Sequence, residues 1–491
     1  MKEKECGRER FVPMTVLFAV YMFEYMVSMV YVQEQYVLSA PGEWVVRGYY
    51  LDLLCTALGF AGTFLYAGRY RDSGKHGSGI LLWAACVCTG VFSVLLMVSF
   101  RLWVFVLVSC IFCLSFGFAG GVVYYRMSGL LSPTDYMGRS MGIGASAALL
   151  TQFLLQHGLQ SGLFQAGLII VGALVTTIIL SWKLPAAMEA GQDFAENDGG
   201  REKPELHRKA VRTAIRVLVI TVLIGVFVVY YNENMLRMIA ETGYEERDIY
   251  SWPRLFGIVS YLVIGFVGDI KKRRLVPFVT LCLIIPGMIV PLVPMSSSFQ
   301  MLNMALFYIA VMAQIAYYNL MFWDVAPKTG KPYLWSGMGR IVAAISEIVF
   351  LMLNITALSD VAMLGVELVI LVLIILNMAW NGDLNPGGLI AASPEQTGIP
   401  SEYVPEYIPV QKLEMMKQYQ EKFKLTEMET EVLKRLISTE DSQQQLADSL
   451  DISSRSLQRH ITSIYDKTGV RTRVGLLISY TQFLTDEGAM K

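Results

Sequence analysis

Residues 446–469 read LADSLDISSRSLQRHITSIYDKTG, and this stretch predicts a short helix, a tight turn and a second helix. Ser453 stands where a side chain can cap the start of the second helix. Three apolar residues then recur at the i, i+4 and i+7 spacing of a helix face that packs inward: Leu457, Ile461 and Ile464. The opposite face is polar, and we expect it to be accessible to the major groove of DNA.

The side chains on that polar face belong to types that read base edges. Arginine pairs with guanine and glutamine with adenine in the major groove. The candidate base-contacting residues are Ser454, Arg455, Gln458, Arg459 and Thr462. Three basic residues that follow in the chain suit contacts with DNA phosphates: Lys467, Arg471 and Arg473. The expected partner is therefore double-stranded promoter DNA. A zinc site is not expected, because no Cys or His residues with zinc-ligand spacing lie near His460.

From Leu425 the chain reads LTEMETEVLKRLISTEDSQQQLADSLDISSRSLQRHITSIYDKTGVRTRVGLL, which resembles the LuxR/GerE-type helix-turn-helix domain along its whole length. The pattern begins with Thr426 and Glu429, spaced as a helix-capping box. The resemblance implies a four-helix DNA-binding domain that forms a homodimer through its last helix, about residues 473–485. Met428 replaces the Arg usual in the family, and Gln458 stands where Lys is common. Acidic residues fall early and basic ones late, so we expect modest, salt-sensitive affinity.

Most of the chain before this domain has the composition of a membrane protein. Of 491 residues, 54% are hydrophobic and only 16% charged, and the mean hydropathy is +0.47. A soluble globular protein carries roughly 25% charged residues. The net charge of −1 carries no information about nucleic acid, and the seven cysteines lie mostly in apolar segments, where we interpret them as buried.

Apolar segments of about 20 residues predict roughly twelve transmembrane helices. They cover residues 11–32, 48–68, 79–100, 102–125, 139–158, 162–183, 212–232, 250–269, 275–295, 300–323, 337–357 and 361–380. Lys and Arg concentrate in every second connection, as in RYRDSGKH (69–76) and KKRR (271–274). Because basic loops stay in the cytoplasm, both termini are expected there, in a bacterial inner membrane.

The twelve expected spans, with a long polar connection at their midpoint, resemble the major facilitator superfamily. GFVGDIKKRR (265–274) is similar to that family's loop motif, in which an acid follows a glycine-containing helix end and a basic cluster comes next. The resemblance implies that Asp269 closes a charge network with basic residues and neighbouring helix ends. The equivalent stretch of the first half, GTFLYAGRYRDSGKH (62–76), has Gly68 where the acid is expected. That departure weighs against active transport, and the KKRR cluster can also be read simply as a topology determinant.

The expected organisation is all-α and has five parts. They are a first six-helix half (1–184), a central cytoplasmic linker (185–211), a second six-helix half (212–381), a linker with a short helix (382–422) and the DNA-binding domain (423–491).

Acidic and aromatic residues inside the spans predict a small-molecule site. A charge at mid-bilayer costs roughly 2.5–3.5 kcal/mol, so it needs a partner or a cavity. The candidate ligand-binding residues are Tyr21, Glu24, Tyr25, Asp52, Gln314, Tyr317, Asn319 and Glu347. Rings and carboxylates suit an aromatic or cationic ligand. The alternative is structural, with the acids paired to one another or to bases such as Arg340.

Together these features favour a one-component membrane regulator of transcription. A transporter-like bundle would sense a small molecule and control the DNA-binding domain, activating a nearby operon with RNA polymerase as a further partner. The alternative is a major-facilitator-type transporter with a regulatory DNA-binding tail. No nucleophile–base pair, metal set or Walker A loop is evident, so the sequence predicts no enzyme, no cofactor and no metal.

Overall fold

The structure is a computed structural model of the chain, which divides into two compact units, Met1–Pro394 and Glu395–Lys491. The residues it describes are 2–98, 101–132, 134–158, 161–181, 204–242, 252–270, 273–288, 297–329, 331–353, 355–380, 418–438, 446–447, 450, 452–470, 472–473, 475–476, 479–480 and 482–483. Throughout these residues the regular structure is helical, as expected.

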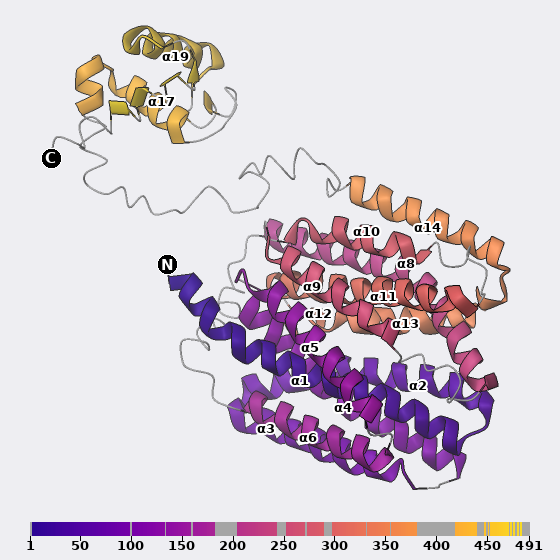
Figure 1. The fold of residues 1–491 in the computed structure, drawn as a ribbon. Helices are drawn as coiled ribbons and strands as arrows, with labels where there is room; N and C mark the ends of the chain where they lie inside the picture. Colours follow the sequence, from indigo (N-terminus) through magenta and orange to yellow (C-terminus); the bar gives the residue numbers. More distant parts are fainter. Residues whose placement is uncertain are drawn as a thin grey trace. The chain divides into compact units, whose positions relative to one another are not determined.

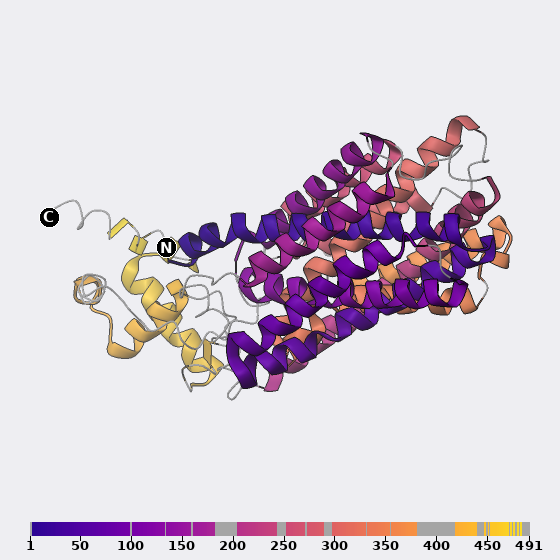
Figure 2. The same ribbon diagram turned by 90° about the horizontal axis from the view of Figure 1, so that it is seen from below.

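The first unit is a bundle of long helices that run side by side (Figures 1 and 2). Its first half contains α1 (Lys2–Ser39), α2 (Gly42–Ala61), α3 (Thr63–Leu95), α4 (Leu102–Leu131), α5 (Met137–Gly158) and α6 (Gly162–Ser181). Its second half contains α8 (Pro204–Thr242), η2 (Trp252–Phe256), α9 (Gly257–Gly268), α10 (Val276–Met288), α11 (Ser297–Val325), η5 (Ala326–Lys328), α12 (Pro332–Trp335), α13 (Met338–Met352), η6 (Ile355–Ala357) and α14 (Asp360–Trp380).

Seven helices in the described part of the chain are long and apolar enough to cross a membrane. Three shorter apolar helices accompany them, at Gly79–Leu95, Arg254–Gly268 and Val276–Gly287. Large apolar side chains such as Trp103, Leu163 and Val361 are more than two-thirds exposed, which suits a surface in contact with lipid. The expected number of twelve spans stays a prediction.

The two halves meet where α5 crosses α9, and small residues make this crossing possible. Gly138 and Gly142 of α5 face Gly265 and Tyr261 of α9, and a Cβ atom on Gly142 would overlap the Tyr261 carbonyl oxygen. Small residues let helix backbones approach closely in a membrane, where packing and not the hydrophobic effect drives association. The sequence therefore supplies glycine where the halves touch backbone to backbone.

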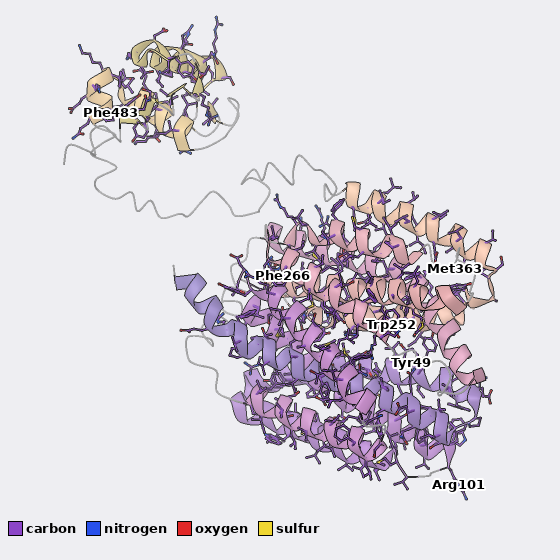
Figure 3. The ribbon with its side chains drawn as sticks, in the orientation of Figure 1. Tyr49, Arg101, Trp252, Phe266, Met363 and Phe483 are labelled. Atoms are coloured by element: carbon purple, nitrogen blue, oxygen red, sulfur yellow. The ribbon has the colours of Figure 1, made fainter. Side chains whose placement is uncertain are left out.

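The second unit is a small helical domain with its own core. Its described helices include α17 (Glu427–Ser438) and α19 (Ser454–Thr468). Leu446 and Ala447 join the α17 and α19 side chains in that core, and Phe483, labelled in Figure 3, packs against Tyr419 with ring centroids 5.1 Å apart. Helix α19 ends at Gly469, whose φ of 72° lies in the left-handed region that glycine adopts without strain.

Replacing Gly142 by leucine should destabilise the first unit. The new side chain meets backbone atoms that cannot turn away, and overpacking of this kind costs about 1–3 kcal/mol. The check is the thermal unfolding temperature of the purified full-length protein in detergent. Gly167→Leu is the matched control, because Gly167 of α6 is exposed and has open space around its Cβ position. Equal unfolding temperatures for the two variants would contradict this account of the crossing.

Candidate functional site

Helix α19 is built as the sequence predicts. The Ser453 hydroxyl accepts a hydrogen bond from the Ser456 amide at 3.2 Å, which caps the first turn. Leu457, Ile461 and Ile464 are buried in the core of the domain. Inward packing of this one stripe turns the opposite stripe of the helix to the outside.

The five candidate base-contacting side chains of α19 are all exposed: Ser454, Arg455, Gln458, Arg459 and Thr462. Thr462 donates its hydroxyl to the Gln458 carbonyl oxygen at 2.9 Å, within its own helix. The other four side chains have no hydrogen bond or ion pair within the described residues. The polar face is thus accessible, and its contact with DNA stays a prediction.

Two of the three expected phosphate contacts are engaged inside the domain. The Lys467 ammonium lies 2.6 Å from a carboxylate oxygen of Glu429, and Arg473 donates to the Leu436 carbonyl oxygen at 2.9 Å. Both bonds attach the C-terminal part of the domain to α17, so these residues have structural roles that the sequence pattern did not reveal. Arg471 lies outside the described residues.

Glu429 is the centre of a hydrogen-bond cluster that holds α17 to α19. It forms the predicted capping box, in which the Thr426 amide donates to its carboxylate at 2.7 Å and its own amide donates to the Thr426 hydroxyl at 3.3 Å. Ser463 and Lys467 of α19 also donate to the same carboxylate. Burial alone would raise the pKa of Glu429, but these hydrogen bonds outweigh it and lower the pKa to about 2.

A cavity of about 190 Å³ lies between the two halves of the first unit. It is lined from both halves by Tyr25 of α1, Tyr49 of α2, Asn232 of α8, Gln314 and Tyr318 of α11, and Arg340 and Glu347 of α13. Tyr49 is labelled in Figure 3, where the two halves meet. Since a cavity of roughly 150 Å³ accommodates benzene, a compound with a single ring fits this space.

Arg340 is one of the charged residues that line the cavity, and it lies against aromatic rings. Its guanidinium stands 4.6 Å from the centroid of the Tyr25 ring and 5.8 Å from that of Tyr318, and its Nε donates to the Tyr124 hydroxyl at 3.0 Å. Tyr25 and Tyr124 belong to the first half, whereas Tyr318 and Arg340 belong to the second. One cation therefore connects both halves through ring faces and a phenol.

Of the eight candidate ligand residues, the structure brings Tyr25, Gln314 and Glu347 to this cavity and places the other five elsewhere. Those five, Tyr21, Glu24, Asp52, Tyr317 and Asn319, are buried but do not line it. Contact of these five with a ligand in this cavity is therefore not supported by their positions.

For two of these five residues, Tyr21 and Glu24, the structure shows which neighbours they contact instead of the cavity. Tyr21 stacks on Phe116 with ring centroids 5.5 Å apart, inside the first half. Glu24 accepts a hydrogen bond from the Thr176 hydroxyl of α6 at 3.3 Å, also inside the first half. Sequence spacing placed Tyr21 and Glu24 near Tyr25 on α1, but the neighbouring helices decide which side of α1 faces the cavity.

The sequence candidates omit most of the residues that line the cavity, among them four with polar or charged side chains. Tyr49, Asn232 and Arg254 line the cavity, and no spacing pattern singled them out. Arg340 was considered only as a structural partner for acids, although a lone arginine in an apolar span was itself a signal of function. These four come from four separate elements, and only the packing of the two halves brings them together.

At one end of the bundle, Asp269 joins the halves as the motif GFVGDIKKRR predicts. Its carboxylate accepts hydrogen bonds from the Gly138 amide at 2.6 Å and the Arg139 amide at 2.9 Å, at the N-terminus of α5. The Arg139 side chain adds an ion pair at 2.8 Å. The predicted charge network is confirmed, and the anion sits where the helix dipole favours it.

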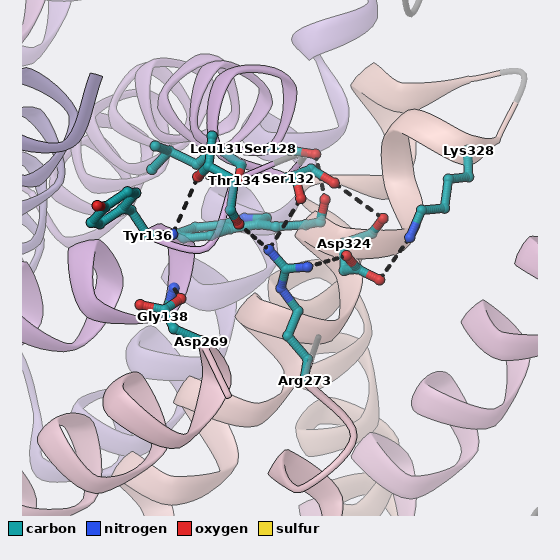
Figure 4. A network of polar contacts seen from close by, with 11 residues as sticks. Ser128, Leu131, Ser132, Thr134, Tyr136, Gly138, Asp269, Arg273, Asp324 and Lys328 are labelled. Atoms are coloured by element: carbon teal, nitrogen blue, oxygen red, sulfur yellow. Dashed lines mark hydrogen bonds and ion pairs between the residues drawn. The ribbon is translucent and has the colours of Figure 1, made fainter. Parts of the chain in front are cut away.

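A second cluster at the same end is centred on Arg273 (Figure 4). Arg273 forms an ion pair with Asp324 at 2.6 Å and donates to the carbonyl oxygens of Ser132 and Thr134, each at 3.1 Å. Lys328 also pairs with Asp324, at 2.9 Å. The φ of Arg273 is 69°, a conformation that costs a non-glycine residue energy and persists because these bonds fix it.

Comparison with known proteins agrees with both parts of the chain. Residues 424–479 match the family model described as bacterial regulatory proteins, luxR family. This part of the chain is a LuxR-type helix-turn-helix domain. No curated protein matches the chain in sequence.

Among solved structures, the fold is similar to that of the human organic anion transporter MFSD10 (TETRAN). The TM-score is 0.51 with 11% identity, over 75% of this chain and 99% of that one. It is also similar to the major facilitator superfamily proton:xylose symporter XylE, with a TM-score of 0.54 and 15% identity, over 76% of this chain and 96% of that one. The first unit thus has the fold of major facilitator proteins.

Replacing Arg273 by glutamine should open the end of the bundle that it closes. Loss of the bonds to Asp324, Ser132 and Thr134 leaves the halves less tightly joined there. In a Ser132→Cys background, labelling by N-ethylmaleimide should accelerate by about tenfold, the factor that about 1.4 kcal/mol produces. Peptide mass spectrometry measures the rate at position 132.

Arg47→Gln is the matched control for that experiment. Arg47 forms an ion pair with Glu43 at 3.3 Å, but both side chains are more than 60% exposed, so the pair contributes little. An unchanged labelling rate in Arg273→Gln would show that the cluster does not hold this end closed.

Glu429→Gln should destabilise the helix-turn-helix domain at neutral pH by an amount on the order of 1 kcal/mol, since Lys467 is about one-third exposed and partly screened. Glutamine keeps the capping box but loses the ion pair. Because the folded pKa is lowered to about 2, the carboxylate stabilises above its ordinary value near 4.5 and loses this effect as the pH falls toward 2.

Hydrogen exchange of α17 and α19 amides in the full-length protein measures this difference. The protection lost in Glu429→Gln should be largest near pH 7 and should disappear at acidic pH. A difference that grows as the pH falls would reverse the sign and refute the role assigned to the carboxylate.

Proposed function

We propose that this protein is a one-component transcriptional regulator embedded in a membrane. Its LuxR-type domain would bind promoter DNA, and its major-facilitator-like bundle would sense a small molecule. The observation that carries the proposal is the accessible polar face of α19, in the same chain as a cavity bounded by both halves of the bundle.

The cavity gives a physical route to sensing. A ligand shifts an equilibrium only by the difference in its affinity for the two states. A compound bound between Tyr25 of the first half and Arg340 of the second contacts both halves, so its affinity depends on how they are arranged. The clusters of Asp269 and Arg273 hold the same two halves together at one end and set the energy that the ligand must overcome.

The remaining parts of the proposal follow from the sequence. The basic connections favour a bacterial inner membrane with both termini in the cytoplasm. Family resemblance favours a homodimer formed through the last helix, recruitment of RNA polymerase and activation of a nearby operon. Dimerisation suits a domain of modest affinity, because a second half-site adds to the contacts of the first.

The DNA-binding part is tested with the full-length protein in lipid nanodiscs. Duplexes selected from a random library should bind in a salt-dependent manner. Arg455→Ala should weaken binding to the selected sequence by about 1–3 kcal/mol, the usual value of a bidentate base contact, and should relax the preference at one base pair. Fluorescence anisotropy across a salt series measures both effects.

Arg435→Ala is the matched control, because Arg435 lies on α17, is 42% exposed and lies 3.9 Å from Glu431 within its own helix. It should leave DNA affinity unchanged. If Arg455→Ala and Arg435→Ala bind every duplex like the unaltered protein, α19 is not the reading element.

Transport with a regulatory DNA-binding tail is the second candidate function. The charge clusters at one end of the bundle favour it, since halves that separate and rejoin there would expose the cavity alternately. Proteoliposomes decide between the two. Accumulation of a compound that also binds in the cavity supports transport, whereas binding without accumulation supports sensing.

A further inference from the structure

Three charged side chains line the cavity: Arg254, Arg340 and Glu347. Arg254 donates a hydrogen bond to Gln152 at 2.7 Å, whereas Arg340 and Glu347 carry opposite charges without pairing with each other. Arg340 and Glu347 both lie on α13 and both line the cavity, seven residues or about two helical turns apart. No ion pair involves either side chain in the part of the chain that the structure describes, and one carboxylate oxygen of Glu347 is buried without a hydrogen-bond partner. Glu367 of α14 is also buried without a partner, but it lies outside the cavity.

The cost of this arrangement points to a ligand. Arg340 and Glu347 are partly buried, and a charge withdrawn even partly from water costs energy unless another group compensates it. Ring faces and the Tyr124 hydroxyl compensate the Arg340 guanidinium only in part, because its strongest partner would be a carboxylate in a two-pronged geometry. Glu347 has no hydrogen-bond or ion-pair partner among the described residues. Each of the two charges therefore remains available to an opposite charge that enters the cavity.

The spacing of the two charges limits the shape of such a ligand. Seven residues at 1.5 Å each place their Cα atoms roughly 10 Å apart along the axis of α13. This spacing favours a ligand whose charges lie at opposite ends of the molecule over one that carries them on adjacent carbons. Between them the walls are aromatic and thioether side chains, among them Tyr25, Tyr49, Phe60 and Met22.

We propose that the cavity binds a single-ring aromatic zwitterion, with its carboxylate on Arg340 and its ammonium group on Glu347. This ligand class rests on the proposed sensing function and makes it specific. It differs from the aromatic or cationic compound expected from the sequence, because the structure adds Arg340 to the site and removes Glu24 from it. The carboxylate end would also reach the Tyr25 and Tyr318 rings, one from each half.

Four para-substituted benzenes of similar size that differ in charge test the proposal. They are 4-(aminomethyl)benzoate (both charges), 4-methylbenzoate (anion), 4-methylbenzylamine (cation) and 4-methylbenzyl alcohol (neutral). Isothermal titration calorimetry with the full-length protein in nanodiscs should show the zwitterion binding at least tenfold more tightly than each of the others. Equal affinities, or no binding of any of the four, would overturn the proposal.

Substitutions assign each charge to its partner. Glu347→Gln should lower the affinity for 4-(aminomethyl)benzoate about tenfold and leave that for 4-methylbenzoate unchanged. Arg340→Gln should lower the affinity for both carboxylates. Glu24→Gln is the matched control, a buried acid outside the cavity, and should change neither. If Glu347→Gln weakens both compounds equally, or Glu24→Gln acts like it, the assignment is wrong. Should Arg340→Gln not fold, Glu347→Gln and its control decide alone.

A parallel measurement of DNA affinity separates this proposal from the one on which it rests. Binding of the zwitterion with no change in DNA affinity supports the ligand class and contradicts sensing. DNA binding by α19 with no preference among the four compounds contradicts the ligand class and leaves the DNA-binding role of the regulator intact.

Discussion

A charge removed from water costs energy unless another group compensates it, and this constraint shapes the contacts between the two halves of the first unit. Asp269 and Arg273 meet it with ion pairs and backbone bonds at one end of the bundle, where they also join the two halves. Arg340 meets it with ring faces and a phenol from both halves. The positions of these charges therefore coincide with the places where the halves must touch, and a change in one is felt by the other.

The same constraint operates on a smaller scale in the helix-turn-helix domain. Glu429 collects donors from its own helix and from α19, so that one carboxylate both caps α17 and fixes α19 against it. Lys467 is consumed in this cluster and does not extend the polar face of α19. Helix α19 is thus held to α17 by charged and polar groups, while the side chains of Arg455, Gln458 and Arg459 on its exposed side have no partner among the described residues.

Control of the DNA-binding domain by a ligand of the bundle, as proposed, has a simple thermodynamic requirement. In the proposed sensing function, a compound in the cavity must prefer one arrangement of the halves by several kcal/mol to switch the protein from mostly one state to mostly the other. Pairing of two ligand charges with Arg340 and Glu347 would supply such a difference, because the Coulomb energy of a charge pair grows as the surroundings become less polar than water. Apolar contact with the ring of a ligand would discriminate far less between the two arrangements.

The sequence by itself determined the local features, because each depends on residues close together in the chain. The capping box of Thr426 and Glu429, the cap at Ser453 and the buried stripe of Leu457, Ile461 and Ile464 were read from short spacings. The network role of Asp269 came from the family resemblance of its loop motif. Only the tertiary structure decided which face of α1 borders the cavity, that Glu24 turns toward α6, and that Arg340 and Glu347 share one space with Tyr25. The reason is that a membrane span is apolar nearly all round, so its sequence carries little record of its orientation, which is set by helices distant in the chain.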